Sequence, residues 1–501
     1  MHAFKSSTEY KELLSSTLKR AELRTDVIQN VVTTYFRCVM LSHRWEVKEL
    51  LLHDIQDKIV YELNPVGGIV KLQSFCRTTR GAGHRWGWVD TCCIDQTNHV
   101  ELQKSLNSMF VWYRHSVLTI VYLSDVAPSS ESGALAKSTW NTRGWTVPEF
   151  LAPKVVLFYQ NDWTLYLDDH SPNHKESPKI MQELEGATGI DTRTLVNFHP
   201  EMKRAREKLQ WVSRRVTTLQ EDIAYSLFGI FGVQLPVMYG EKKQNALGRL
   251  LQEIIAQSGD ITALDWVGRS SEFNSCLPAD ITSYEAPPYA LPSIFEDEMQ
   301  TSVSALRDSD LKLAVKLYST LDYLSAPRFA HRRLHLPCIV FPVTEVRRRP
   351  CRDQETYFTY QVKVDKLHNL LISTEDKLPQ FSHARPIRQS FLLVRPWDRH
   401  LLGLPDFEDD TQSEDGWTAL ESPLQDTPSE FLGRRKSVDS ELVDRALRLI
   451  VRLGQPFNAF LLAQQRGGEY KRMASDHDII AQVKDIGSVH DMMDIRTLEI
   501  L

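Results

Sequence analysis

Residues 86–96 read WGWVDTCCIDQ, residues 118–125 read LTIVYLSD, and residues 143–150 read RGWTVPEF. The first stretch places aromatic rings, adjacent thiols and carboxylates within one short segment. A core strand needs only apolar side chains, so this mixture indicates a place for chemistry or recognition. The strands around it decide where these side chains lie.

The composition sets limits on the class of protein. The chain has 501 residues, 42% hydrophobic and 25% charged, which is enough for two or three globular domains. A formal net charge of −6 provides no positive field for nucleic acid or acidic membranes. The sequence shows neither a secretory signal nor an apolar run long enough to cross a bilayer. We therefore expect a soluble, cytoplasmic protein that has no membrane span and binds no nucleic acid.

Four short apolar runs predict strands, and segments with helical spacing lie between them. The runs are residues 36–41, 86–89, 118–123 and 155–159, and the clearest helical pattern covers residues 102–113. Strands that alternate with helices are typical of an α/β fold with a parallel sheet covered on both faces. We expect right-handed crossovers between these strands.

Polar and aromatic residues follow the predicted strands. In parallel sheets the ligand crevice lies beyond the carboxyl ends of the strands. The residues that this rule selects are Ser42, Trp45, Asp90, Asp95, Gln96 and Asp125, with Glu149 just before the fourth strand. Seven of the 11 tryptophans also lie within residues 1–175. This clustering fits either a tryptophan-rich core or an aromatic-walled pocket for a flat ligand.

The remaining chain predicts further domains. Short alternating strands after residue 300 indicate an antiparallel β-rich domain, and prolines mark a linker before it. In the helical part, Thr218 and Glu221 have the spacing of a capping box, which gives Glu221 a structural role. The predicted segments are a helical lead-in at 1–34, an α/β core at 35–175, a helical extension at 176–275, a linker at 276–300, and a β-rich domain at 301–501 with a flexible, acidic insertion at 405–440.

Cysteine usage gives no catalytic or metal-binding pattern. The seven cysteines include one adjacent pair, Cys92 and Cys93, and no CxxC motif. This fits reduced thiols rather than a disulfide framework or a zinc site. The spacing to the histidines fixes no nucleophile and base, so we expect packed thiols and no metal centre.

Five motifs in a fixed order resemble the HET (heterokaryon incompatibility) domain family of fungi. The resemblance covers roughly residues 35–270, and the tail that ends YKRMASDHDII is similar to the C-terminal region of some stand-alone members. The motifs are LSHRW (41–45), WVDTCCIDQ (88–96), NSMFVWYRHS followed by YLSDV (107–126), RGWTVPEF (143–150) and WVSRRVTTLQEDIAYSLFGIFGVQLPVMYGEK (211–242).

The resemblance implies a role in nonself recognition after cell fusion, where HET domains trigger or execute programmed cell death. It also implies a fold like that of Toll/interleukin-receptor (TIR) domains, some of which hydrolyse NAD with a glutamate. Two functions follow. One is a signalling module that associates with itself or with another incompatibility protein. The other is a NAD hydrolase, for which NAD is the substrate and no further cofactor is implied.

For an enzyme, Glu149 is the candidate catalytic carboxylate, because a carboxylate beside a ribosyl carbon stabilises an oxocarbenium-like transition state. Asp90 and Asp95 would fix ribose hydroxyls, and Arg143 would pair with phosphates. Ser42, Gln96 and the base-stacking candidates Trp45 and Trp145 complete the ligand-binding set. The structural alternative is that Glu149 caps a helix or pairs with Arg143, while Asp90 and Asp95 hold a loop.

Two positions depart from the family pattern. Glu46 stands where members usually carry glycine, in the first loop near the site. Pro148 stands where they usually carry glutamine, which removes an amide group next to Glu149.

Overall fold

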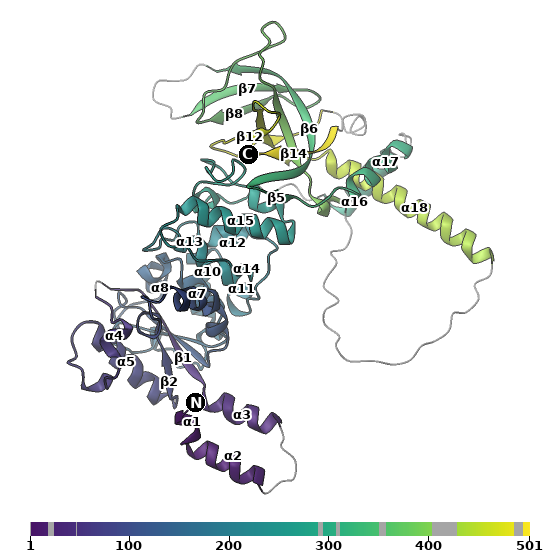
Figure 1. Ribbon diagram of the computed structural model, residues 1–501. Helices are drawn as coiled ribbons and strands as arrows, with labels where there is room; N and C mark the ends of the chain where they lie inside the picture. Colours follow the sequence, from purple (N-terminus) through teal and green to yellow (C-terminus); the bar gives the residue numbers. More distant parts are fainter. Residues whose placement is uncertain are drawn as a thin grey trace. The chain divides into compact units, whose positions relative to one another are not determined.

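The computed structural model describes residues 2–18, 25–46, 48–288, 294–306, 311–349, 357–402, 428–484 and 494–501 (Figure 1). The chain divides into two compact units. The first comprises Met1–Met202 and Lys208–Leu250, and the second comprises Lys203–Glu207 and Leu251–Leu501. Within the described ranges, every helix falls short of the length and apolar character that a membrane span requires.

A parallel sheet of four strands is the centre of the first unit, as the sequence predicts. Its order is β2-β1-β3-β4, and all three pairings are parallel. The strands are β1 (Cys38–His43), β2 (Trp86–Trp88), β3 (Leu118–Tyr122) and β4 (Val156–Tyr159). Alternate apolar residues, including Val39, Leu41 and Ile120, are buried in one core with side chains from neighbouring helices.

Helices link these strands. They are α4 (Leu52–Ile55), α5 (Gly68–Gly81), α6 (Asp90–Cys93), α7 (His99–Arg114), α8 (Ala134–Lys137) and α9 (Thr146–Leu151). The longest of them, α7, begins after Asn98, whose side chain accepts hydrogen bonds from two main-chain N–H groups of the first turn. The buried Tyr113 of α7 donates its hydroxyl proton to the carbonyl of Leu41 at 2.9 Å, which fixes α7 against β1.

Three further helices precede the sheet: α1 (His2–Lys5), α2 (Thr8–Leu18) and α3 (Thr25–Tyr35). Aromatic rings join them to the edge strand β2. Phe4 packs on Tyr35 and Phe36, and Phe36 stacks on Trp86. The indole N–H of Trp86 also donates to the carbonyl of Tyr35 at 2.9 Å.

The helices after β4 are α10 (Pro178–Thr188), α11 (Thr192–Val196), α12 (Ala205–Val212), α13 (Asp222–Tyr225), α14 (Phe228–Phe231) and α15 (Lys243–Ser258), of which α12 and α15 contribute residues to both units. At Gly229 a Cβ atom would lie 2.2 Å from Cβ of Phe110, so only glycine allows α14 to approach α7 this closely. The predicted capping box is wrong. The N-cap of α13 is Glu221 itself, and its carboxylate accepts from the N–H of Gly240 at 2.7 Å.

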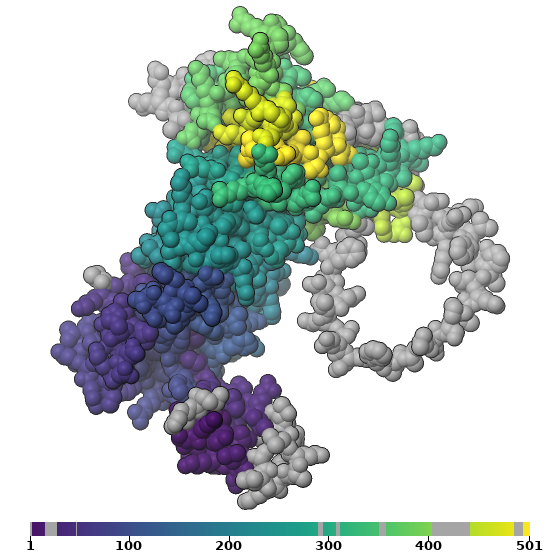
Figure 2. Space-filling model, viewed as in Figure 1, coloured from purple at the N-terminus to yellow at the C-terminus, as the bar shows by residue number. Residues whose placement is uncertain are grey.

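The second unit contains the predicted sheet, which is largely antiparallel. Its order is β14-β12-β11-β9-β6-β7-β8, and β14 also pairs with β6, so that β6, β9, β11, β12 and β14 form a closed ring. The green and yellow atoms of this unit gather in one region of the space-filling view (Figure 2). The strands of this unit are β5 (Arg328–Ala330), β6 (Arg333–Arg348), β7 (Phe358–Val364), β8 (Leu370–Thr374), β9 (Phe391–Pro396), β10 (Phe457–Asn458), β11 (Phe460–Gln464), β12 (Tyr470–Met473), β13 (Ile480–Ala481) and β14 (Asp494–Ile500).

Three helices of the second unit were not predicted: α16 (Glu296–Ala305), α17 (Leu311–Asp322) and α18 (Pro428–Leu453). Ala446, Leu449 and Ile450 of α18 are buried in the same core as the strands. Residues 405–427 of the predicted insertion lie outside the described residues. Residues 428–440 form the first part of α18.

Candidate functional site

The carboxyl ends of β1 and β2 bring the first site residues together. Ser42 and His43 are the last residues of β1, and Asp90 begins α6 directly after β2. Because β1 and β2 are adjacent and parallel, both ends lie at the same edge of the sheet. Glu149 reaches this edge from α9, which contacts β1.

Glu149 is held in a buried chain of hydrogen bonds. The hydroxyl of Ser42 donates to its Oε2 at 2.6 Å, and the indole Nε1–H of Trp140 donates to the Ser42 hydroxyl at 2.9 Å. Ser42 is fully buried, Trp140 is 2% exposed and Glu149 is 4% exposed. The buried side chains of Ser42 and Trp140 therefore hold the carboxyl group of Glu149 in place.

The pKa of Glu149 is raised to about 8, because burial disfavours its charged form and the nearby Asp90 carboxylate repels a second negative charge. The charge of Arg143 and the hydrogen bond from Ser42 oppose this shift without cancelling it. Glu149 is thus largely protonated at pH 7.

Asp90 stays ionised beside it. Its Oδ1 lies 3.1 Å from Nε2 of His43 and accepts the N–H of Thr91 at 2.8 Å, and its Oδ2 accepts the indole N–H of Trp45 at 2.7 Å. Burial raises the pKa of Asp90, but the hydrogen bonds and the charges of His43 and Arg143 outweigh it, so that the pKa lies below its usual value. The edge therefore holds one ionised and one protonated carboxyl group.

Arg143 spans the edge rather than forming a direct ion pair with Glu149. Its Nη1 donates to the carbonyl of His43 at 2.7 Å, and its guanidinium lies over the ring of Trp45 at 5.4 Å. Arg215 donates at 3.0 Å to the carbonyl of Arg143, which holds this residue in place. Trp45 is 38% exposed, so this aromatic and cationic pair faces solvent while Glu149 does not.

Comparisons with known proteins place a similarity in this part of the chain. Residues 39–135 match the family described as Heterokaryon incompatibility protein (HET). This stretch is similar to a HET domain. Over 236 residues, or 45% of the chain, the sequence is 35% identical to "Vegetative incompatibility protein HET-E-1" of Podospora anserina, but it spans only 16% of that protein's length. No solved structure matches the chain significantly. These matches support a role related to incompatibility.

The matched stretch contains Ser42, His43, Trp45 and Asp90, whereas Arg143 and Glu149 follow it. Two further residues of the matched stretch do not join the cluster. Asp95 accepts from the N–H and the hydroxyl of Thr97 at 3.0 and 2.6 Å, and Gln96 is partly exposed. Among the described residues, no hydrogen bond links either of them to Ser42, Asp90 or Glu149.

Asp125, at the end of β3, also has a local role. It accepts from Ser138 and Thr139, both of which lie at the start of the next short helical turn. Pro148 occupies the third position of α9, where a main-chain N–H has no partner within the helix, so the proline causes no break. Glu46 is exposed in the loop after Trp45.

Asp222 is a site neighbour that the sequence analysis missed. Trp145 hydrogen-bonds its carboxylate, and the hydroxyl of Tyr239 donates to it at 3.0 Å. Burial raises the pKa of Asp222, although both hydrogen bonds and the charge of Arg143 oppose the shift. Asp222 thereby ties the predicted residue Trp145 to the helical extension. The only sequence signal was its position next to Glu221.

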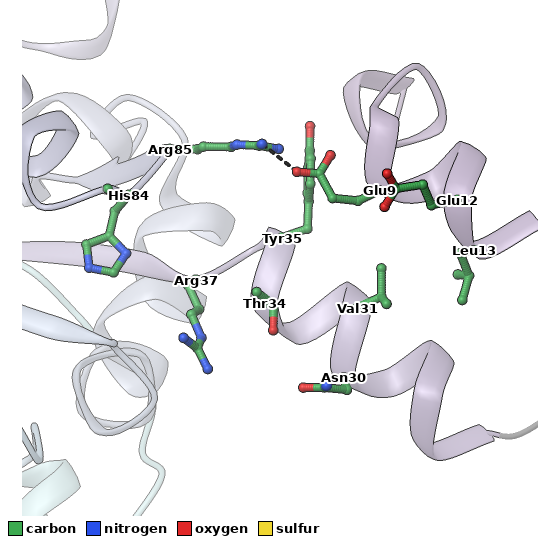
Figure 3. A pocket seen from close by; sticks show the side chains of 11 residues that line it. Glu9, Glu12, Leu13, Asn30, Val31, Thr34, Tyr35, Arg37, His84 and Arg85 are labelled. Atoms are coloured by element: carbon green, nitrogen blue, oxygen red, sulfur yellow. Dashed lines mark hydrogen bonds and ion pairs between the residues drawn. The ribbon is translucent and has the colours of Figure 1, made fainter. Parts of the chain in front are cut away.

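A cavity of about 510 Å³ lies at the opposite, amino-terminal edge of β1 and β2 (Figure 3). Arg37, His84 and Arg85 line it from the strand side, and α2 and α3 provide the other wall. Arg85 forms an ion pair with Glu9 across it. The lining of this cavity carries both signs of charge, and the cavity opens widely to solvent. It therefore provides no converging catalytic groups comparable to those around Glu149.

Proposed function

We propose that the chain triggers cell death in an incompatibility reaction, with the HET domain as its effector part. The observation that carries this proposal is the 35% identity over 236 residues to a protein named for vegetative incompatibility. The polar cluster of Ser42, Asp90 and Glu149 supports it, because buried, mutually repelling carboxyl groups at a strand-end edge are typical of functional sites. The chain would act in the cytoplasm, together with copies of itself or another incompatibility protein.

The test is controlled expression of the full chain in a filamentous fungus, with colony growth and dye uptake by dying cells as readouts. The wild type should arrest growth and kill cells. Glu149→Gln keeps the size of the side chain and most of its hydrogen bonding, and it should abolish killing at equal protein levels. Glu46→Gln, an exposed site in the same unit, should kill as the wild type does. Growth unaffected by wild-type protein, alone and in fusion with an incompatible strain, would refute the proposal.

A second candidate is hydrolysis of NAD by a TIR-like active site. The arrangement of the edge favours it, because the ionised Asp90 and the exposed Trp45 with Arg143 lie beside the carboxyl group of Glu149. In this proposal Glu149 stabilises the ribosyl cation and Asp90 binds a ribose hydroxyl. Trp45 stacks on a base and Arg143 meets the phosphates, and both lie at the exposed side of the same edge.

The resting site would be inactive in this scheme. Glu149 is 4% exposed and largely protonated at pH 7, so it neither contacts a substrate nor stabilises a cation as a carboxylate. Opening of the edge would admit water and lower the pKa of Glu149, which converts it to the active form. Self-association of the chain would supply this opening, since a second copy can favour the open state by binding it more tightly.

Purified chain at high concentration should therefore consume NAD and release nicotinamide, measured by liquid chromatography. Glu149→Gln should show no turnover, and Asp95→Asn should retain it. Turnover that rises more steeply than in proportion to protein concentration would support activation by association. If wild-type protein kills cells but NAD is stable in vitro and in those cells, the enzyme proposal is wrong and the signalling proposal stands.

A further inference from the structure

The adjacent thiols of Cys92 and Cys93 end α6, the short helix that begins with Asp90. All six cysteines in the described part of the chain are free. Only Cys93 among these six is exposed, while Cys92 next to it is 3% exposed. The pair thus joins one exposed cysteine residue to one buried cysteine residue.

One donor points at the sulfur of Cys93: the main-chain N–H of Val89 donates to its Sγ at 3.4 Å. The Cys92 thiol donates its own proton to the carbonyl of Val89 at 4.0 Å. A donor that faces a sulfur favours its thiolate, which is the reactive form of cysteine.

The electrostatics agree with this geometry. The neighbouring Cys92 thiol, and after it the N–H of Val89, lower the pKa of Cys93, and they outweigh the opposing effects of burial and of Asp90. Burial raises the pKa of Cys38 to about 11 and also raises that of Cys76. Cys38 and Cys76, both partly buried in the same unit, are therefore natural controls.

We propose that Cys93 is a site of reversible oxidation by peroxides, and that the oxidised sulfur closes a disulfide with Cys92. In the first step the Cys93 thiolate attacks a peroxide oxygen, the O–O bond breaks, and sulfenic acid and hydroxide (or alkoxide) form. In the second step the Cys92 sulfur attacks the sulfenic sulfur, the S–O bond breaks, and water leaves with the Cys92 proton. The thiols lose two electrons and the peroxide gains them.

The disulfide would change the structure at the sheet edge where β1 and β2 have their carboxyl ends. Adjacent Cα atoms are about 3.8 Å apart, below the range of about 4.4 to 6.8 Å that a relaxed disulfide spans, so the bridge distorts the backbone and is easily reduced. In α6 that distortion lies directly after Asp90, which holds His43 and Trp45. Oxidation therefore loosens these contacts. The chemistry itself depends on neither proposed function.

The experiment uses the full chain with Cys351→Ser, because Cys351 lies outside the described residues. Hydrogen peroxide is added at pH 7 with the sulfenic-acid trap dimedone, and peptides are quantified by mass spectrometry. Cys93 should react roughly ten times faster than Cys38 or Cys76. Cys92→Ser should accumulate the Cys93–dimedone adduct, whereas the Cys92-containing chain should instead form a peptide with a Cys92–Cys93 bridge that dithiothreitol reverses.

Two results would overturn the proposal. One is equal or slower oxidation of Cys93 relative to Cys76, and the other is a bridge from Cys93 to a cysteine other than Cys92. If Cys92→Ser fails to fold, the rates and the bridge mapped in the Cys92-containing chain decide the question alone. The pH profile of iodoacetamide alkylation gives an independent reading, since Cys93 should reach half its maximal rate at a lower pH than Cys76.

Discussion

The two units bury charge in different ways. In the second unit Arg472 donates to the carbonyls of Leu264 and Trp266 at 2.7 and 3.2 Å, and its guanidinium packs on the rings of Trp266 and Phe460. In the first unit two carboxyl groups, Asp90 and Glu149, repel each other at one edge. Fixed dipoles satisfy a buried charge at any pH, whereas two neighbouring acids change state with pH or with opening of the site. The contrast separates a structural site from a candidate functional one.

The largest expected effect is at Arg472, the structural site of the second unit. Arg472→Met keeps the length and apolar stem but leaves two buried carbonyls without their donor. We expect the second unit to lose about 2–5 kcal/mol of unfolding free energy, because each buried acceptor left unsatisfied costs about 1–3 kcal/mol. Hydrogen exchange of β11 and β12 in the full chain would measure it.

Arg445→Met is the matched control, since within the described ranges Arg445 pairs only with Glu441, one turn away on the exposed face of α18. Its cost should stay below about 0.5 kcal/mol. Equal effects of the two substitutions would show that the buried hydrogen bonds of Arg472 add little.

Glu149→Gln tests the pair of carboxyl groups in the first unit. The folded pKa of Glu149 is about 8, above that of a glutamate in unfolded chain, so the folded state binds the extra proton. Stability should therefore fall as pH rises from about 4.5 towards 8, by up to about 1.4 kcal/mol per pH unit. Glutamine cannot ionise, so the variant should lack this slope and be the more stable protein at pH 8.

Urea unfolding followed by tryptophan fluorescence at several pH values suits this test, because all tryptophans except Trp266, Trp397 and Trp417 lie in the first unit. Glu46→Gln, which changes an exposed carboxylate, should keep the wild-type slope. The same slope in wild type and Glu149→Gln would mean that Glu149 is ionised in the folded state.

The sequence predicts the sheet better than the site. Continuous apolar runs define β1 to β4, and parallel order then places Ser42 and Asp90 at one edge. Glu149 precedes β4 and reaches that edge only through the packing of α9 on β1. The sequence does not separate Asp90 from Asp95, because a shared loop does not show which carboxylate turns inward. Asp222 was missed for a related reason: it reaches Trp145 through tertiary packing that no spacing encodes.

Asp90→Asn and Asp95→Asn measure that difference between neighbours. Asp90 accepts from three groups and also raises the pKa of Glu149, so its variant should lose about 1–3 kcal/mol and shift the pH dependence of stability to lower pH. Among the described residues, the carboxylate of Asp95 accepts hydrogen bonds only within its own loop, and asparagine keeps an acceptor there. Its variant should change stability by less than about 0.5 kcal/mol. A larger effect of Asp95→Asn would show that Asp95 belongs to the candidate site.

Lys175 shares features with both Arg472 and Glu149, and its substitution has the smallest expected effect. It is 2% exposed, its ammonium donates to the carbonyl of Leu151 at 3.3 Å, and it lies over the ring of Phe150. This resembles the arrangement around Arg472, but an ammonium that loses water needs more than one long hydrogen bond. Burial first, and the charge of Arg114 second, accordingly lower the pKa of Lys175 to about 7.

The sign of the pH dependence is opposite to that of Glu149. Above pH 7 folded Lys175 loses its proton while the unfolded chain keeps it to about pH 10.4, so its contribution to stability rises with pH over this range. Lys175→Met removes both the slope and the charge, and at pH 6 it should stabilise the first unit by about 1 kcal/mol. Destabilisation of that size at pH 6 would instead place Lys175 with Arg472, as a buried cation whose partners satisfy it.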